Sequence, residues 1–133
     1  MSRVDGGPAR GALPASATRR RTNRVWLVAF AVLLVVHLAA LYWPRVAVDG
    51  PVTWSDKAVH VALFALPAAA GLLAGLRRVL VIVPLALHAP LSEVLQHTAL
   101  PNRSGDLADA VADLAGVVLG ATLVVVGRAR SRW

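Results

Sequence analysis

The 133-residue chain contains no cysteine, a single lysine and only seven acidic residues. The absence of cysteine excludes disulfides, thiol nucleophiles and thiolate metal sites. No glycine-rich phosphate loop is present, so the usual sequence signal for a nucleotide site is also missing. Charged residues make up 16% of the chain and hydrophobic residues 57%. At this length the chain is one domain, and it is too apolar for an ordinary small soluble one.

The net charge of +7 comes from arginines that stand in short clusters between apolar runs. A nucleic-acid-binding domain would spread such charge over a soluble face. Clusters beside apolar runs are instead typical of membrane topology signals and of contacts with anionic lipid. We therefore predict membrane lipids as partners and no nucleic acid. The sequence does not specify an oligomeric state.

Four apolar runs are long enough to cross a bilayer, which predicts an all-α integral membrane protein built as a compact four-helix bundle. The predicted spans are 25–43, 56–76, 79–97 and 107–127. A disordered basic tail (1–24) precedes them, and a short basic tail (128–133) follows. A signal peptide is the competing interpretation of the first run. However, the run is longer than a typical signal-peptide core and lacks a clear A-x-A site before Pro44, which favours an uncleaved helix.

The basic residues predict the orientation of the bundle. If both termini are inside the cell, only Arg45, Lys57 and Arg103 lie on the outer side, and all other basic residues lie inside. The positive-inside rule therefore predicts an N-in, C-in, multi-pass protein of the bacterial plasma membrane. In this orientation every acidic residue except Asp5 lies at or near the outer face.

Small residues and prolines predict how the spans pack. We expect Gly71 and Gly75 to permit a close helix contact, and Pro67 to kink the second span. In the third span, Pro84 and Pro90 are expected to interrupt the helix. In the fourth span a small residue recurs at every fourth position and forms a ridge for another helix: Ala108, Ala112, Gly116 and Gly120.

Polar side chains recur at helical spacing near the predicted outer ends of three spans. They are Asp56, Lys57 and His60 on the second, Glu93, Gln96 and His97 on the third, and Asp106, Asp109 and Asp113 on the fourth, with Arg103 and Ser104 in the preceding loop. The spacings place each set on one helix face. Carboxylates inside apolar runs are costly unless they serve a site or a paired network. Three such sets at one depth predict a shared, outward-facing pocket.

Simpler roles remain open for several of these residues. Asp106 is also suited to cap the fourth helix, and Lys57 to extend toward the interface. Arg103 would form a purely structural ion pair with Glu93 or Asp109. Histidines and carboxylates are suitable metal ligands, but no H-E-x-x-H or comparable motif is present, so we predict neither metal nor cofactor.

Two further histidines, His37 and His88, are weaker candidates for a site. His88 lies on the helix face opposite Glu93, four residues after Pro84. Its ring is expected to bond a backbone carbonyl that this proline leaves free.

Three ordered motifs, D-K-A-V-H-V-A-L-F-A-L (56–66), E-V-L-Q (93–96) and L-P-N-R-S-G-D-L-A-D-A-V-A-D-L-A-G-V-V-L-G (100–120), resemble the VanZ-like membrane family. The resemblance covers roughly half of the chain. The family's motif positions match Asp56, Lys57, His60, Phe64, Glu93, Gln96, Pro101, Arg103, Ser104, Asp109, Gly116 and Gly120. Asn102 and Asp113 depart from the usual glycine and asparagine. The resemblance implies a four-helix membrane protein of the cell envelope and a connection with low-level teicoplanin resistance, but no known reaction.

Three hypotheses follow for the pocket. In the first, Lys57, His60 and Arg103 hold an anionic headgroup of a lipid-linked or wall-precursor molecule, while the carboxylates orient them. The remaining candidate ligand-binding residues are Asp56, Glu93, Gln96, Ser104, Asp109 and Asp113. In the second, which we favour less, the protein is a membrane enzyme with Glu93 or Asp109 as general base near His60. In the third, the polar groups only lock the bundle.

Overall fold

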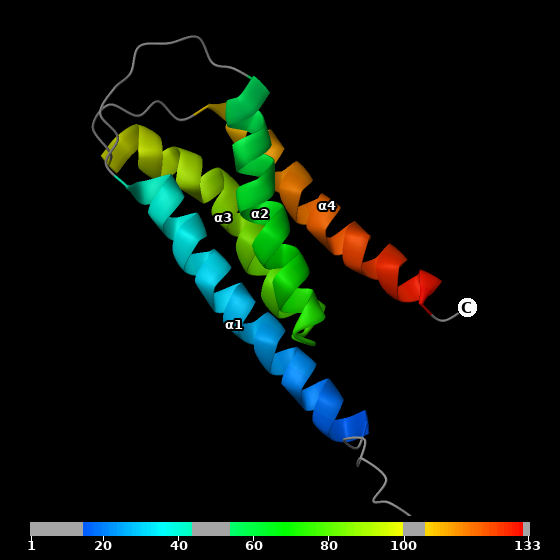
Figure 1. The fold of residues 1–133 in the computed structure, drawn as a ribbon. Coiled ribbons are helices and arrows are strands. Elements are labelled where there is room, and N and C mark those ends of the chain that lie inside the picture. Colours follow the sequence, from blue (N-terminus) through cyan, green and yellow to red (C-terminus); the bar gives the residue numbers. More distant parts are fainter. Residues whose placement is uncertain (1–14, 44–53, 100–105, 132–133) are drawn as a thin grey trace, which may run out of the picture.

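The computed structural model describes residues 15–43, 54–99 and 106–131. These residues form four α-helices and no strand, which confirms the all-α prediction for this part of the chain (Figure 1). The helices are α1 (Ala15–Tyr42), α2 (Trp54–Leu73), α3 (Arg78–Ala99) and α4 (Leu107–Arg130). Each contains a segment long and apolar enough to cross a membrane.

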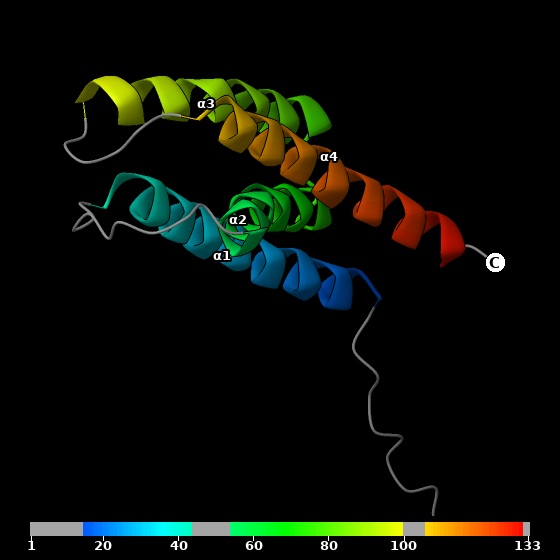
Figure 2. The ribbon, with the colours of Figure 1, turned by 90° about the horizontal axis from the view of Figure 1, so that it is seen from above.

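The four helices run alternately up and down the bundle (Figures 1 and 2). The start of α1, the turn between α2 and α3 and the end of α4 therefore lie at one end. The starts of α2 and α4 lie with the ends of α1 and α3 at the other. This order brings both ends of the helical region to the same side, as the predicted topology requires. Which side faces the cytoplasm stays a prediction.

Helix α2 is central to the packing, with its most extensive contacts to α4 and then to α1. Two glycines allow α4 to approach α2 closely. A Cβ atom on Gly116 would collide with the backbone carbonyl of Val61, and one on Gly120 with that of Ala65. The predicted ridge of small residues is thus confirmed at these two positions. It does not extend to Ala108, which is exposed.

The hairpin between α2 and α3 differs from the prediction. Helix α2 ends at Leu73, because Gly75 adopts a positive φ of 86°. The N–H of Leu76 donates to Gly71, and the N–H of Gly75 donates to Leu72, which is the hydrogen-bond pattern of a Schellman cap. Gly75 therefore terminates the helix. The predicted close contact is confirmed at Gly71, where a Cβ atom would lie 3.0 Å from Phe30 of α1 and from Val81 of α3.

Two other boundary predictions were wrong. Helix α1 begins at Ala15, so residues 15–24 of the predicted disordered tail are helical. This segment follows Pro14 and contains alanine and arginine, both of which favour helix. Helix α3 continues from Arg78 to Ala99 through Pro84 and Pro90, so these prolines do not interrupt it. Neighbouring helices and polar side chains can compensate for the hydrogen bonds that prolines remove.

The outer surface of the bundle is apolar. Many large hydrophobic side chains are exposed, including Val28, Val35, Leu87 and Leu123, each more than 60% exposed. Monomeric soluble proteins rarely expose apolar surface on this scale. The exposed side chains and the four long apolar helices are consistent with a multi-pass membrane protein.

Candidate functional site

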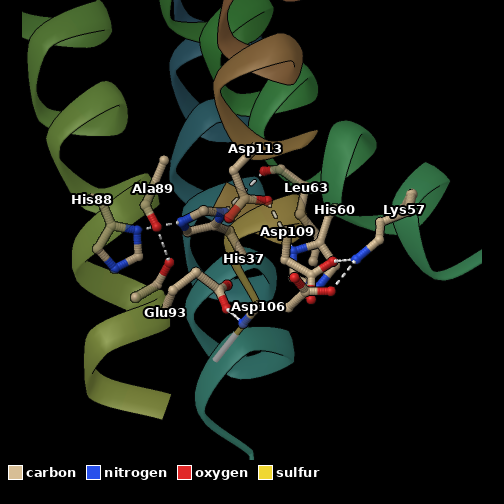
Figure 3. A network of polar contacts seen from close by, with 11 residues as sticks. His37, Lys57, His60, Leu63, His88, Ala89, Glu93, Asp106, Asp109 and Asp113 are labelled. Carbon is tan, nitrogen blue, oxygen red and sulfur yellow. Dashed lines mark hydrogen bonds and ion pairs between the residues drawn. The ribbon is translucent and has the colours of Figure 1, made fainter. Parts of the chain in front are cut away.

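Polar side chains of α2, α3 and α4 meet at the end of the bundle where α2 and α4 begin (Figure 3). We call this group the polar cluster: Lys57, His60, Glu93, Gln96, Asp106, Asp109 and Asp113. The sequence predicted that residues of these three helices converge, and the contacts described below confirm it. Their roles in binding or catalysis stay predictions.

Lys57 lies at the margin of the cluster and contacts two carboxylates of α4. Its Nζ atom is 3.0 Å from Oδ2 of Asp106 and also donates to Oδ1 of Asp109 (Figure 3). The lysine side chain is 22% exposed. The carboxylates of Asp106 and Asp109 thus balance the positive charge of Lys57, so Lys57 does more than extend toward the interface.

Asp106 both caps α4 and joins the cluster. Its side chain accepts a 2.9 Å hydrogen bond from the N–H of Ala108, and its backbone is extended as an N-cap requires. This bond, followed by the contact with Lys57, lowers the pKa of Asp106 below its ordinary value. The backbone N–H of Asp106 also donates to Oε2 of Glu93 at 2.9 Å. The two roles that the sequence left open therefore coexist.

His60 and Asp113 form the most deeply buried contact of the cluster. His60 Nδ1 lies 2.9 Å from Asp113 Oδ1, and Asp113 is completely buried. A neutral His60 would donate from Nδ1 to this carboxylate, whereas a protonated one would form an ion pair with it. Asp113 lies roughly two turns into α4 from Asp106, as the sequence spacing predicts.

Three buried atoms of the cluster have no hydrogen-bond partner within the described part of the chain: Oε1 of Glu93, Nε2 of Gln96 and Oδ2 of Asp113. Buried polar atoms are nearly always paired in folded proteins. Potential ligand atoms of His60, Glu93 and Asp113 also lie within 4.8 Å of one another. The centre of the cluster therefore offers unpaired acceptors and a donor to a bound molecule or ion.

A groove of about 340 Å³ between α3 and α4 reaches the cluster. Its lining residues are Pro90, Glu93, Val94, His97, Thr98, Asp106, Leu107 and Ala110. Most of its surface is apolar, and Glu93 and Asp106 contribute carboxylates. Such a groove suits a ligand with a hydrocarbon part and a polar head.

A second polar network, which the sequence did not predict, joins α1, α2 and α3. We call it the histidine chain: Tyr42, His88, His37 and the backbone carbonyl of Leu63. Figure 3 shows His88, His37 and Leu63. His37 Nδ1 is 3.0 Å from the Leu63 oxygen, and His37 Nε2 is 3.0 Å from His88 Nδ1. The hydroxyl of Tyr42 is 2.8 Å from His88 Nε2.

The carbonyl fixes the direction of every hydrogen bond in the histidine chain. Because Leu63 can only accept, Nδ1 of His37 must donate, and Nε2 of a neutral His37 must accept from His88. His88 Nε2 then accepts from the Tyr42 hydroxyl. With both rings neutral, every ring nitrogen is partnered and no charge is buried.

Pro67 explains why the histidine chain ends at the backbone carbonyl of Leu63. Proline has no N–H, so the carbonyl four residues earlier, that of Leu63, loses its helical partner. His37 replaces that donor. The expectation that a histidine bonds a carbonyl freed by proline is correct in kind, but the residues are His37 and Pro67. His88 instead contacts His37 and Tyr42. Pro67 was the sequence signal that could have identified this role.

The remaining predicted residues are less central. Asp56 is half-buried in the first turn of α2 and, with His60 and Asp109, forms a second group whose ligand atoms lie within 4.8 Å. His97 is exposed and lines the groove. Arg103 and Ser104 lie outside the described residues.

Comparisons of the chain with protein-family models, with curated proteins and with solved structures found no match.

Proposed function

We propose that this chain is a cell-envelope membrane protein whose polar cluster binds the headgroup of a lipid-linked molecule. The observation that carries the proposal is the set of buried atoms on Glu93, Gln96 and Asp113 that have no partner within the described residues, together with a mostly apolar groove that Glu93 lines. A hydrocarbon chain would lie along Val94, Leu107 and Ala110. The headgroup would then face Glu93.

The charges of the cluster favour a headgroup rich in hydrogen-bond donors. Within the polar cluster four carboxylates accompany two basic side chains, Lys57 and His60, and Lys57 already contacts two of those carboxylates. An anion would therefore meet acceptors more than free donors. Hydroxyl, amide or ammonium groups of a wall-precursor or glycolipid headgroup would pair with Glu93 and Asp113, and Gln96 would donate to a headgroup oxygen.

The resemblance to the VanZ-like family supports the same proposal. It implies a four-helix membrane protein of the cell envelope, and the distribution of basic residues predicts both termini inside, with the cluster facing outward. The resemblance also implies a connection with low-level teicoplanin resistance. Comparing teicoplanin susceptibility with and without the intact protein in its own host tests this part.

Lipid capture tests binding in the groove. The protein would be purified in mild detergent, and co-purifying lipids would be identified by native mass spectrometry. Val94→Trp places an indole in the groove, whereas Leu87→Trp places one on an exposed position of the same helix outside it. We expect a lipid adduct in wild type and Leu87→Trp, and its loss in Val94→Trp. Equal occupancy in all three proteins, or none in wild type, would contradict the proposal.

A second candidate function is catalysis on the same headgroup, which the buried contact between His60 and Asp113 beside Glu93 favours. A carboxylate that orients a histidine is a common arrangement in acid–base catalysis. Glu93 is the better candidate base, because Asp109 is engaged by Lys57. Turnover of lipid-linked substrates by purified protein, abolished by Glu93→Gln, would establish an enzyme. Binding without turnover would leave the first function.

A further inference from the structure

We propose that His60, Glu93 and Asp113 bind one divalent cation at the centre of the polar cluster. The three residues come from α2, α3 and α4, and all are buried. Their potential ligand atoms lie within 4.8 Å of one another. The ligands of a tetrahedral Zn²⁺ ion lie about 3.4 Å apart, so the three side chains would draw together around the ion.

The unpaired oxygens distinguish this group from an ordinary cluster of acidic residues. Oε1 of Glu93 and Oδ2 of Asp113 have no hydrogen-bond partner within the described residues, and Asp113 is fully buried. Two carboxylates in an apolar interior carry a high desolvation cost. A divalent cation would neutralise both charges and use the free oxygens as ligands.

The ligand types indicate which ions would fit. One imidazole nitrogen and two carboxylate oxygens suit Zn²⁺ or Mn²⁺, whereas soft ions such as Cu⁺ prefer thiolates, which this chain lacks. Three protein ligands leave at least one coordination position open. The unpaired amide nitrogen of Gln96, three residues after Glu93 on α3, is placed to donate to a water or ligand in that region.

The outer group of Asp56, His60 and Asp109 is a poorer site for the ion. Asp109 already contacts the ammonium of Lys57. A cation bound to the outer group would share this carboxylate with Lys57 and would lie close to the positive charge of the lysine. Among the described residues, His60, Glu93 and Asp113 have no contact with a lysine.

Metal content tests the inference without any lipid or activity. The full chain would be purified in detergent, stripped with EDTA, exposed to Zn²⁺ or Mn²⁺ and freed of unbound ions by gel filtration. We expect about one ion per chain by elemental mass spectrometry. Glu93→Gln and Asp113→Asn should each weaken binding at least about tenfold, because even outer-sphere partners of a metal contribute on this scale. Both replacements preserve shape and one acceptor oxygen.

Asp56→Asn separates the two possible groups. We expect its affinity for the ion to stay within about twofold of wild type, because a half-exposed charge is screened by solvent. No bound ion in folded wild-type protein would overturn the inference. So would loss of the ion in Asp56→Asn with retention in Asp113→Asn. If Asp113→Asn does not fold, Glu93→Gln and the wild-type content decide. Because lipid plays no part, failure here leaves the proposed headgroup binding intact.

Discussion

The bundle contains two polar regions, and they differ in how completely their atoms are paired. The histidine chain is closed at both ends: Tyr42 donates at one end, and the Leu63 carbonyl accepts at the other. The polar cluster leaves an oxygen of Glu93, an oxygen of Asp113 and the amide nitrogen of Gln96 without a partner within the described residues. A fully paired, neutral network stabilises a fold. An incompletely paired, charged one costs free energy unless something binds to it.

The two regions also differ in the helix contacts on which they depend. The histidine chain compensates for a proline within α2 and ties α1 and α3 to that helix. The polar cluster depends on the close contact of α2 with α4. Changes in the histidine chain should therefore alter stability, and changes at Glu93, Gln96 and Asp113 in the polar cluster should alter binding. The predictions that follow test this separation.

The largest effect is expected from Gly116→Ala, which acts on the frame of the polar cluster. The new Cβ would collide with the backbone carbonyl of Val61, so α4 must move away from α2. Overpacking of this kind costs about 1–3 kcal/mol or more. Gly127→Ala is the matched control, because its Cβ would meet nothing within 4 Å. Thermal unfolding in detergent should show a marked loss for Gly116→Ala and none for Gly127→Ala.

A smaller but more specific effect is expected from His37→Leu. The substitution leaves the Leu63 carbonyl and the His88 donor unpaired, which costs about 1–3 kcal/mol. Pro67→Ala restores an N–H four residues after Leu63. In that background the cost of His37→Leu should fall by about 1 kcal/mol, measured by a double-mutant cycle of unfolding free energies. Equal costs in both backgrounds would show that the carbonyl is not the partner that matters.

Tyr42→Phe should have a modest effect confined to the histidine chain. It removes only the hydroxyl that donates to His88 Nε2, with an expected cost of about 0.5–1.5 kcal/mol. Lipid and metal binding should be unchanged, since the polar cluster uses neither residue. A loss of binding with unchanged stability would mean that the two regions are not separate.

The smallest effect is expected in how the contribution of Asp106 to stability depends on pH. The pKa of Asp106 is lowered by the Ala108 N–H and by Lys57, so its contribution is present above its ordinary value of 3.8 and is lost as the pH falls through the lowered one. Unfolding curves between neutral and acidic pH should therefore converge for wild type and Asp106→Asn at low pH. A difference that persists in acid would show that ionisation of Asp106 is not responsible.

The sequence predicted much of this architecture because its signals are local. Apolar runs define four helices, and the spacing of Glu93, Asp109 and Asp113 places them on inward faces. The ends of helices were less predictable, since the end of α2 depends on the backbone conformation of Gly75. The histidine chain was missed because it depends on distant residues: His37 and His88 meet only when α1 and α3 pack together. The pairing of Lys57 with Asp106 and Asp109 is likewise a property of the packed bundle.

The most direct test of the account is the unfolding temperature of Asp113→Asn in the presence of EDTA. The amide retains an oxygen to accept from His60 and removes a buried charge that lacks a partner on its second oxygen. If the cluster is built to bind, the chelated variant should unfold at the same temperature as chelated wild type or a higher one. A clearly lower unfolding temperature would show that Asp113 stabilises the bundle in its free state. In that case the polar cluster, like the histidine chain, would be structural.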